Sequence, residues 1–390
     1  MSDIKRVLPL AGANCISIVA LGINIPLLSF FVVSQGGTDF QATLIFAIFS
    51  AASFLVSPFW GKLSDKIGRK PAIVASLGLT VISYIWLANA DGLWEIFGSR
   101  ILAGLSSGWM SIPLAFVGDV TSKENRAKGM GIIGASFGVG FMVGPPLQAL
   151  LVGAKDNPDF MTPILVAAGF AFVGLLIVLA FVKEPERHRA DDRHLTVRIL
   201  KDRKVTGLLV IYFSVFLVWT GVEGVFALWS LREFNLGPAD VGLFLGVGGV
   251  VSALVQGGLI GRLVKRYGES NIVITGVVIL AISLIILQQA SEIWMIYLVM
   301  SLFGVAMGLH TPAMQSLFSR VAPAGRQGEV MGAAQSANSL ARVIGPAWAG
   351  FVFVNLGYSM PYLMGGLFLL PVLVAIFFIT KNLNVVATQS

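Results

Sequence analysis

One carboxylate lies deep inside an otherwise apolar stretch of this chain. Glu223 follows a run of mostly apolar residues that begins near Val205, so it falls past the middle of that stretch. A carboxylate buried away from water costs free energy to keep charged, which makes Glu223 a candidate proton carrier. Four residues share its face at helical spacing and give it aromatic neighbours for an amphipathic or cationic ligand: Trp219, Thr220, Phe226 and Ser230.

A second polar face lies in a later apolar stretch. Gln335, Asn338, Ser339 and Arg342 follow one another at i, i+3, i+4 and i+7, so they lie on one side of a helix. We expect this face to line a cavity that contains water or substrate. Arg342 can pair with Glu223 and release it on protonation, or it can hold an anionic group of a substrate. A purely structural ion pair is the alternative for both residues.

Two further titratable residues lie inside apolar stretches. Arg100 is a candidate for proton coupling, although Glu95, five residues earlier, can simply neutralise it. His310 stands beside Thr311 and Pro312. A buried histidine is usually a packing residue, and its near-neutral titration keeps a role as a proton site open.

The elements that position these residues are predicted to be membrane helices. The chain of 390 residues is 56% hydrophobic and only 12% charged, whereas soluble domains have about 25% charged residues. A membrane span needs about 20 mostly apolar residues. Twelve such stretches predict an all-α membrane protein: 7–34, 40–60, 71–89, 93–118, 128–152, 161–182, 205–231, 241–260, 271–289, 293–318, 328–354 and 358–380.

The positive charges predict the orientation of these spans. Nearly all of the 27 Lys and Arg residues lie at the termini or in one alternate set of loops, and the opposite loops hold only Lys155 and Arg232. Such a bias places both termini in the cytoplasm, and we expect a plasma (bacterial inner) membrane protein. Because the cations flank membrane spans, the net charge of +7 does not indicate a nucleic-acid partner.

The two halves of the chain repeat one another. Gly61-Lys-Leu-Ser-Asp-Lys-Ile-Gly68 recurs 200 residues later as Gly261-Arg-Leu-Val-Lys-Arg-Tyr-Gly268, with Lys265 in place of Asp65 and Glu269 in place of Arg69. Further pairs recur at the same offset or one residue more: Gly104 and Gly304, Gly108 and Gly308, Arg126 and Arg326, Gly144-Pro145 and Gly345-Pro346. We predict six-helix bundles over 1–182 and 205–390, joined by a cytoplasmic linker over 183–204.

The run Gly61–Pro71 resembles a loop of a known transporter family. It matches the cytoplasmic loop between helices 2 and 3 of the major facilitator superfamily at Gly61, Leu63, Asp65, Gly68, Arg69 and Lys70. The resemblance implies twelve helices in two halves around a central cavity. It also implies that Asp119 and Arg126 form inner-face ion pairs with this loop, which latch the outward-open state.

Two other motifs resemble the drug:proton antiporter branch of that superfamily. Gly140, Gly144 and Pro145 resemble the antiporter motif of span 5, although Gln148 and Ala149 stand where paired glycines are usual. Arg100 and Gly104 match the span-4 motif R-x-x-q-G, with Ala103 in place of the glutamine, and the resemblance implies proton coupling at Arg100. The run from Arg100 to Pro146 looks most like tetracycline exporters.

These patterns favour proton-coupled efflux of amphipathic, drug- or tetracycline-like small molecules by alternating access. Span 1 carries Asn14 and Asn24 where known exporters often have an acid, and we expect both amides to contact substrate together with Trp219, Phe226 and the polar face of span 11. Two buried arginines against one glutamate keep open an alternative, a transporter of an anionic or lipid-like metabolite by symport or uniport. A receptor or scaffold without transport is a third class.

An enzyme is not expected, because no nucleophile–base constellation, metal cluster or phosphate loop is present in the sequence. We therefore expect no cofactor and no metal. The partners expected are a small-molecule substrate, protons and the lipid bilayer. The glycine-rich spans can satisfy internal packing without a second chain, so we expect a monomer.

Overall fold

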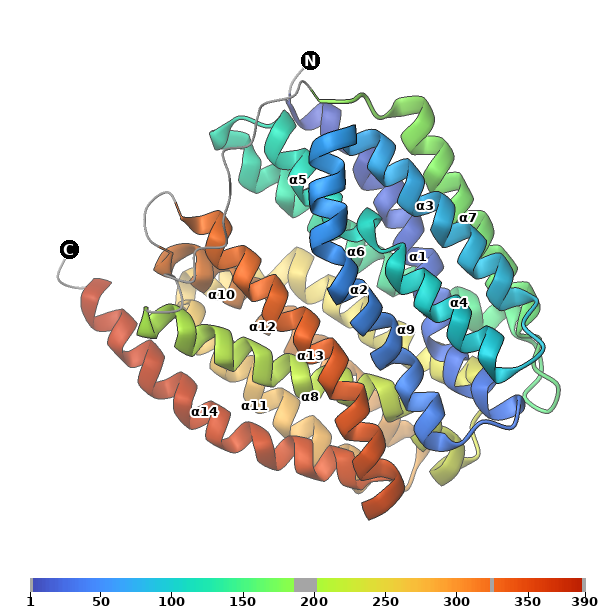
Figure 1. Cartoon of the computed structure of the whole chain (residues 1–390). Helices are drawn as coiled ribbons and strands as arrows, with labels where there is room; N and C mark the ends of the chain where they lie inside the picture. Colours follow the sequence, from blue (N-terminus) through green and yellow to red (C-terminus); the bar gives the residue numbers. More distant parts are fainter. Residues whose placement is uncertain (1–2, 186–201, 323–325, 388–390) are drawn as a thin grey trace. The chain divides into compact units, whose positions relative to one another are not determined.

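The protein is helical throughout the part of the chain that the structure describes. The structure is a computed structural model that describes residues 3–185, 202–322 and 326–387, and no strand occurs in those ranges (Figure 1). Twelve helical segments there are long and apolar enough to cross a membrane. The prediction of an all-α, multi-pass membrane protein is confirmed.

The chain divides into two compact units. Unit 1 comprises Met1–Asp192 with Asn235–Gly246, and unit 2 comprises Arg193–Phe234 with Val247–Ser390. Most of the predicted linker 183–204 lies outside the described residues, and the domain boundaries at 182 and 205 stay a prediction.

Unit 1 is built mainly from the first seven helices. Their bounds are α1 (Asp3–Ser34), α2 (Asp39–Ile67), α3 (Arg69–Ala88), α4 (Leu93–Leu105), α5 (Gly108–Val120), α6 (Lys123–Leu151) and α7 (Met161–Phe181). The central helix is α1, which packs on α6 and α7, while α2 packs on α4 and α3 packs on α4, α5 and α7. α2 starts at a capping box, in which the Thr38 hydroxyl accepts from Gln41 N and the Gln41 side chain accepts from Thr38 N.

Unit 2 repeats this arrangement. Its elements are α8 (Arg203–Phe234), α9 (Pro238–Leu254), the π-helical turn η2 (Val255–Leu259), α10 (Ile260–Tyr267), α11 (Glu269–Gln288), α12 (Ile293–Val321), α13 (Gln327–Leu356) and α14 (Met360–Ala387). α8 packs on α13 and α14, and α11 packs on α12 and α14. The first part of α9, up to Gly246, belongs to unit 1.

The repeat read from the sequence is visible in the packing of each unit. α3 and α11 have the same length at an offset of 200 residues. A Cβ on Gly104 would lie 2.6 Å from Ala52 Cβ, and a Cβ on Gly304 would lie 2.9 Å from Val251 Cβ. Because no real Cβ makes such contacts, both glycines are needed for the close approach of α4 to α2 and of α12 to α9.

Two spans differ from the continuous helices that we predicted. The span Leu93–Val120 is broken after Leu105, whose carbonyl accepts a hydrogen bond of 2.7 Å from the indole of Trp60. The span Pro238–Tyr267 continues through η2 and α10, seven residues beyond its predicted end at 260.

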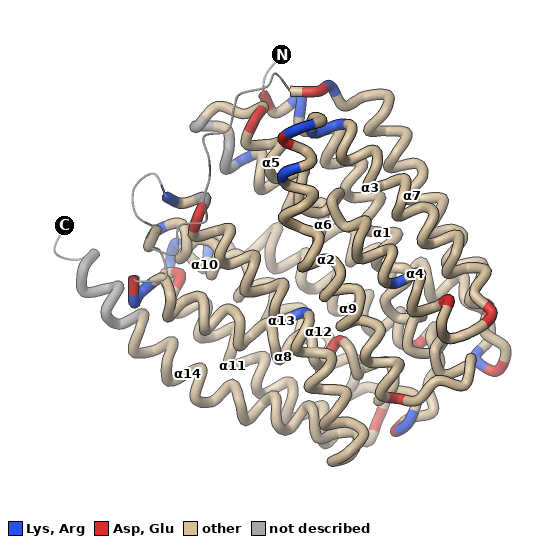
Figure 2. Tube along the Cα trace, in the orientation of Figure 1, with Lys and Arg blue, Asp and Glu red and all other residues tan. Residues whose placement is uncertain are grey.

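Charged residues lie mostly at the ends of the helices, and the middles are almost free of them (Figure 2). α7 and α14 expose apolar side chains such as Phe172 and Phe378, as expected of helices that face lipid. α1 and α8 have the largest buried shares among the candidate spans. They are therefore the helices best placed to hold polar groups away from lipid.

Candidate functional site

An ion pair joins the middles of α8 and α13. Glu223 Oε2 lies 4.0 Å from Arg342 Nη1, and the two side chains are 19% and 41% exposed. Glu223 stands farther from the ends of its helix than any other described helical carboxylate. The pair is long for a salt bridge and partly open, so a proton or an anionic group can compete for either partner.

The ion pair is held by a close crossing of the two helices. The Thr220 hydroxyl donates to the carbonyl of Ala341 across the crossing at 3.0 Å. A Cβ on Gly221 would lie 3.0 Å from the carbonyl oxygen of Gly345, and one on Gly224 would lie 3.0 Å from Pro346. Because small residues face each other here, α8 and α13 approach closely enough for Glu223 to reach Arg342.

The two aromatic residues predicted beside Glu223 differ in their exposure. Trp219 is half-buried, and its ring meets Phe303 edge-on at 5.6 Å. Phe226 is only 2% exposed and lies 6.1 Å from the ring of Trp229, in the core of unit 2. Of the two, Trp219 is the one with surface left for a substrate.

The polar face of α13 is accessible along most of its length. Gln335 is exposed, and Asn338, Ser339 and Arg342 are half-buried. The Asn338 side-chain oxygen is buried and has no hydrogen-bond partner among the described residues. Amide and hydroxyl groups beside Arg342 can orient polar groups of a ligand.

His310 of α12 sits in an aromatic environment. Its ring stacks on Tyr212 at 6.1 Å, and Phe216 lies at 6.2 Å. The residue is 1% exposed, and within the described part of the chain neither ring nitrogen has a hydrogen-bond partner. These surroundings favour a packing role over a proton site.

Unit 1 contains a second buried polar cluster. Arg100 of α4 is 2% exposed, and its guanidinium lies over the ring of Phe49 in α2 at 4.8 Å. It interacts with the hydroxyl of Tyr84 in α3, which also interacts with Asn24 of α1. Glu95, the neutralising partner that we considered, instead accepts a 2.6 Å hydrogen bond from the backbone N–H of Asp91. That alternative is therefore wrong, because the Glu95 carboxylate faces the start of α4.

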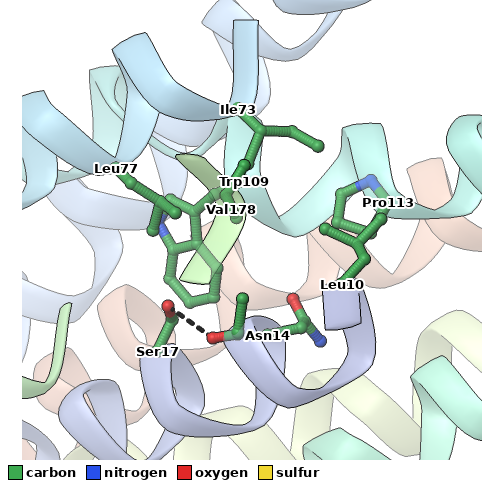
Figure 3. Close-up of a pocket in the computed structure, with 9 residues that line it drawn as sticks. Leu10, Asn14, Ser17, Ile73, Leu77, Trp109, Pro113 and Val178 are labelled. Carbon is green, nitrogen blue, oxygen red and sulfur yellow. Dashed lines mark hydrogen bonds between the residues drawn. The ribbon is translucent and has the colours of Figure 1, made fainter. Parts of the chain in front are cut away.

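Asn14 lies beside a small cavity inside unit 1 (Figure 3). Its Nδ2 donates to the Ser136 hydroxyl at 2.8 Å, while Oδ1 has no hydrogen-bond partner among the described residues. The cavity, which Trp109 and Pro113 also line, has room for about one water molecule. A drug-sized ligand does not fit here, since such pockets hold roughly 300–1,000 Å³.

The charged loop between α2 and α3 forms a compact network. Arg69 Nε donates to Asp119 Oδ2 at 2.7 Å, and Arg69 Nη1 reaches Asp65 Oδ1 and the Ser64 hydroxyl, both at 2.6 Å. Gly68 has a φ of +111°, a conformation that favours glycine. The backbone therefore changes direction between α2 and α3 at Gly68. The predicted end of this span at residue 60 is wrong, because α2 continues through Gly61 to Ile67.

Glu184 completes this network from the end of span 6. Its carboxylate accepts from the backbone N–H groups of Arg69 at 2.6 Å and Lys70 at 2.7 Å. It thereby satisfies free N–H groups at the start of α3, where the helix dipole also favours an anion. A Cβ on Gly68 would lie 2.7 Å from Glu184 Oε1, so glycine is also needed to admit the carboxylate.

Unit 2 has the corresponding contact with the charges exchanged. Glu269 Oε2 lies 2.5 Å from Arg320 Nη1, and Glu269 Oε1 accepts from the Ser316 hydroxyl at 3.1 Å. At the N-terminal end of α13, Arg326 pairs with Glu329 at 2.8 Å, and this hydrogen bonding raises the pKa of Arg326. The side chain of Arg126, the counterpart of Arg326, lies outside the described part of the structure.

The antiporter-like motif lies where α6 crosses α1. A Cβ on Gly144 would lie 2.7 Å from Gly22 Cα, and one on Gly140 would lie 2.6 Å from Ile18 Cβ. Pro145 follows inside α6, where it removes one backbone N–H donor. These glycines therefore act as the contact surface between two helix backbones.

Comparison with known proteins decides the family. The Major Facilitator Superfamily profile matches residues 10–346 and, in a second match, 208–387. The chain belongs to the Major Facilitator Superfamily. The class C tetracycline resistance protein of Escherichia coli is 28% identical over 359 residues, which cover 89% of each chain. Multidrug resistance protein 2 of Bacillus subtilis (strain 168) is 26% identical and covers 90% of this chain and 89% of its own.

A solved structure agrees with the fold. The crystal structure of the human organic anion transporter MFSD10 (TETRAN) superposes with a TM-score of 0.74 and 23% sequence identity, covering 96% of this chain and 100% of that chain. Because the sequence identity is only 23%, this structural similarity shows the major facilitator fold and does not indicate a substrate. The relatives named here are transport or resistance proteins.

Within this superfamily fold, the structure brings some predicted residues together and adds others. Glu223 meets Arg342, and Arg69 meets both Asp65 and Asp119. Two residues of these polar networks, Glu184 and Tyr84, were not predicted from the sequence. Glu184 was counted within the linker, although its place directly after an apolar span, before Pro185, marks a fixed helix end. Tyr84 gave no signal, because a tyrosine in an apolar span is unremarkable until the arginine beside it is known.

Proposed function

We propose that this superfamily member exports amphipathic, drug- or tetracycline-like molecules in exchange for protons by alternating access. It works as a monomer in the plasma (bacterial inner) membrane, with both termini in the cytoplasm. The observation that carries the proposal is the Glu223–Arg342 pair, which places one titratable carboxylate mid-span beside a half-exposed guanidinium. The tetracycline and multidrug resistance relatives support the substrate class.

The pair acts as the coupling element in this proposal. Two unit charges 4.0 Å apart attract by about 1 kcal/mol in water and about 4 kcal/mol at an effective dielectric constant of about 20. Since Arg342 is 41% exposed, the lower part of that range applies. A proton on Glu223 removes this attraction and frees Arg342, which shifts the balance between the two transport states.

The energy available is sufficient for export. One proton that crosses about 100 mV supplies about 2.3 kcal/mol, and each tenfold gradient requires about 1.4 kcal/mol. One carboxylate can therefore sustain a substrate gradient of roughly fiftyfold. The inner-face network around Arg69 supplies the contacts that stabilise one of the two states.

Accumulation of tetracycline in energised cells tests this function. Cells that express the wild type are expected to accumulate less tetracycline than cells with an empty vector, and Glu223→Gln is expected to abolish the difference. Ser230→Ala is the matched control, because Ser230 is buried on the same helix and its hydroxyl donates to the Phe226 carbonyl of that helix. Equal accumulation with Glu223→Gln and wild type would contradict the proposal.

One observation favours a second candidate, transport of an anionic or lipid-like metabolite by symport or uniport. Arg100 is buried, and none of the carboxylates in the described part of the chain pairs with it. For this candidate, transport should depend on Arg100 or Arg342 more strongly than on Glu223. A panel of drugs and organic anions compared across these three variants separates the two functions.

A further inference from the structure

Arg100 differs in its surroundings from Arg342, the arginine in the middle of α13. Arg342 has Glu223 beside it, whereas Arg100 has, among the described residues, the Tyr84 hydroxyl and the face of the Phe49 ring. Its Nε and Nη1 atoms are buried and have no hydrogen-bond partner among the described residues. Since an arginine side chain keeps its charge in proteins, a full positive charge lies in unit 1 without a negative partner in the part of the chain that the structure describes.

The Arg100 side chain does not extend toward the membrane surface to place its charge in water. Arg100 is the eighth residue of α4, so its Cα lies about 10 Å along the helix axis from the first residue of α4. A long arginine side chain can span such a distance to reach water. Here the side chain is only 2% exposed and stays over Phe49, so the guanidinium is held inside the helix bundle.

The neighbours of Arg100 provide further polar groups. Tyr84 is 2% exposed and presents a hydroxyl that can donate a hydrogen bond. Asn24 is 1% exposed, and its Oδ1 lacks a hydrogen-bond partner in the described part of the chain, while its Nδ2 bonds to Ala20 O at 3.0 Å. The three side chains come from α4, α3 and α1, which all belong to unit 1.

We propose that Arg100 and Tyr84, whose hydroxyl Asn24 positions, form a subsite in unit 1 that binds the carboxylate of an organic anion. The guanidinium supplies the charge and free N–H donors, and the tyrosine hydroxyl supplies a neutral donor. The Phe49 ring covers one face of the guanidinium, which leaves the in-plane N–H groups for the carboxylate. This inference rests on the proposed transport function, to whose substrate class it adds amphipathic molecules with a carboxylate.

A binding experiment with a simple probe tests the subsite. The purified full-length protein in nanodiscs is titrated with benzoate, and its thermal midpoint is compared with that in benzamide, a neutral molecule of the same shape. Ligands that bind only the folded state raise the midpoint. We expect benzoate, and not benzamide, to raise the midpoint of the wild type.

Three variants assign the effect to Arg100. Arg100→Met is expected to lose the benzoate shift, and Arg100→Lys, which keeps the charge but has a single ammonium, is expected to bind benzoate about tenfold or more weakly. Ser99→Ala should keep the shift, since the Ser99 hydroxyl donates to the Ile96 carbonyl on the same helix and not to a group of the subsite. If Arg100→Met does not fold, the benzoate affinity of Arg100→Lys alone tests the subsite.

Two results of the same titration would contradict the subsite. A wild type that responds to benzoate no more than to benzamide contradicts it, as does a benzoate shift of the same size and affinity in Arg100→Lys or Arg100→Met. The titration needs no proton gradient, so it is independent of antiport. A Glu223→Gln protein that loses proton coupling and keeps the benzoate shift would leave the subsite standing.

Discussion

Glu269 Oε2 lies 2.5 Å from Arg320 Nη1, and this pair occupies the place in unit 2 that Arg69 and Asp119 occupy in unit 1. Each pair connects the start of the third helix of its repeat to the C-terminal end of the fourth span. The repeat has therefore kept the contact while exchanging the signs of its charges. Charge complementarity, and not a particular residue at either position, is what the fold requires here.

The exchanged pair leads to a charge-swap prediction. Glu269→Arg or Arg320→Glu alone should lower the thermal midpoint, because each places like charges together. The double variant should recover most of the loss. Arg320 is 57% exposed, so the attraction recovered is about 1 kcal/mol or less. A double variant as unstable as the sum of the two single variants would contradict the contact.

Glu184 is predicted to stabilise the start of α3. Glu184→Ala removes the acceptor for two backbone N–H groups, and loss of a helix cap typically costs about 1 kcal/mol. We expect a lower thermal midpoint of the purified protein. Lys183→Ala, at the exposed neighbouring position, is the control and should leave the midpoint unchanged. Equal midpoints for the two variants would argue against the cap.

Glycines of α6 should differ in their tolerance of alanine. Gly144→Ala places a methyl group 2.7 Å from Gly22 Cα, and overpacking of this kind costs about 1–3 kcal/mol. Gly134→Ala and Gly138→Ala meet nothing within 4 Å and gain helix propensity of about 1 kcal/mol. Thermal midpoints should fall for Gly144→Ala and stay equal or rise for the other two. A uniform response of the three would contradict the crossing.

His310 is predicted to be dispensable for proton coupling. Its ring nitrogens lack hydrogen-bond partners among the described residues and lie between aromatic rings. His310→Leu should therefore retain drug-evoked proton movement, and its stability should be unchanged or higher, since an unpaired buried polar group costs about 1–3 kcal/mol. Loss of proton movement in His310→Leu, with the protein still folded and inserted, would return His310 to the coupling path.

Much of the fold follows from the sequence, because membrane spans and repeats leave strong signals. Apolar length predicts each of the twelve spans, and the recurrence of Gly61–Gly68 at Gly261–Gly268 predicts two related units. The predicted positions of the helix ends were less accurate. α2 runs on past Gly61 because Lys62, Ser64 and Lys66 are compatible with a helix outside the lipid, so only the positive φ at Gly68 ends it.

The candidate site was predictable only in part. Helical spacing placed Trp219 and Phe226 on the face of Glu223, but spacing cannot tell where that face is covered. Packing against Trp229 buries Phe226 and leaves Trp219 partly free. Contacts between helices far apart in sequence, such as Arg100 with Tyr84, depend on which helices are neighbours, and no single span contains that information.

Proton release from inverted membrane vesicles tests the central claim most directly. Vesicles acidified inside by respiration should release protons when tetracycline is added, as the drug enters in exchange. The account predicts release with the wild type and with Ser230→Ala, and none with Glu223→Gln. Release of the same size with Glu223→Gln, or a wild type that takes up tetracycline without moving protons, would contradict proton-coupled export through Glu223.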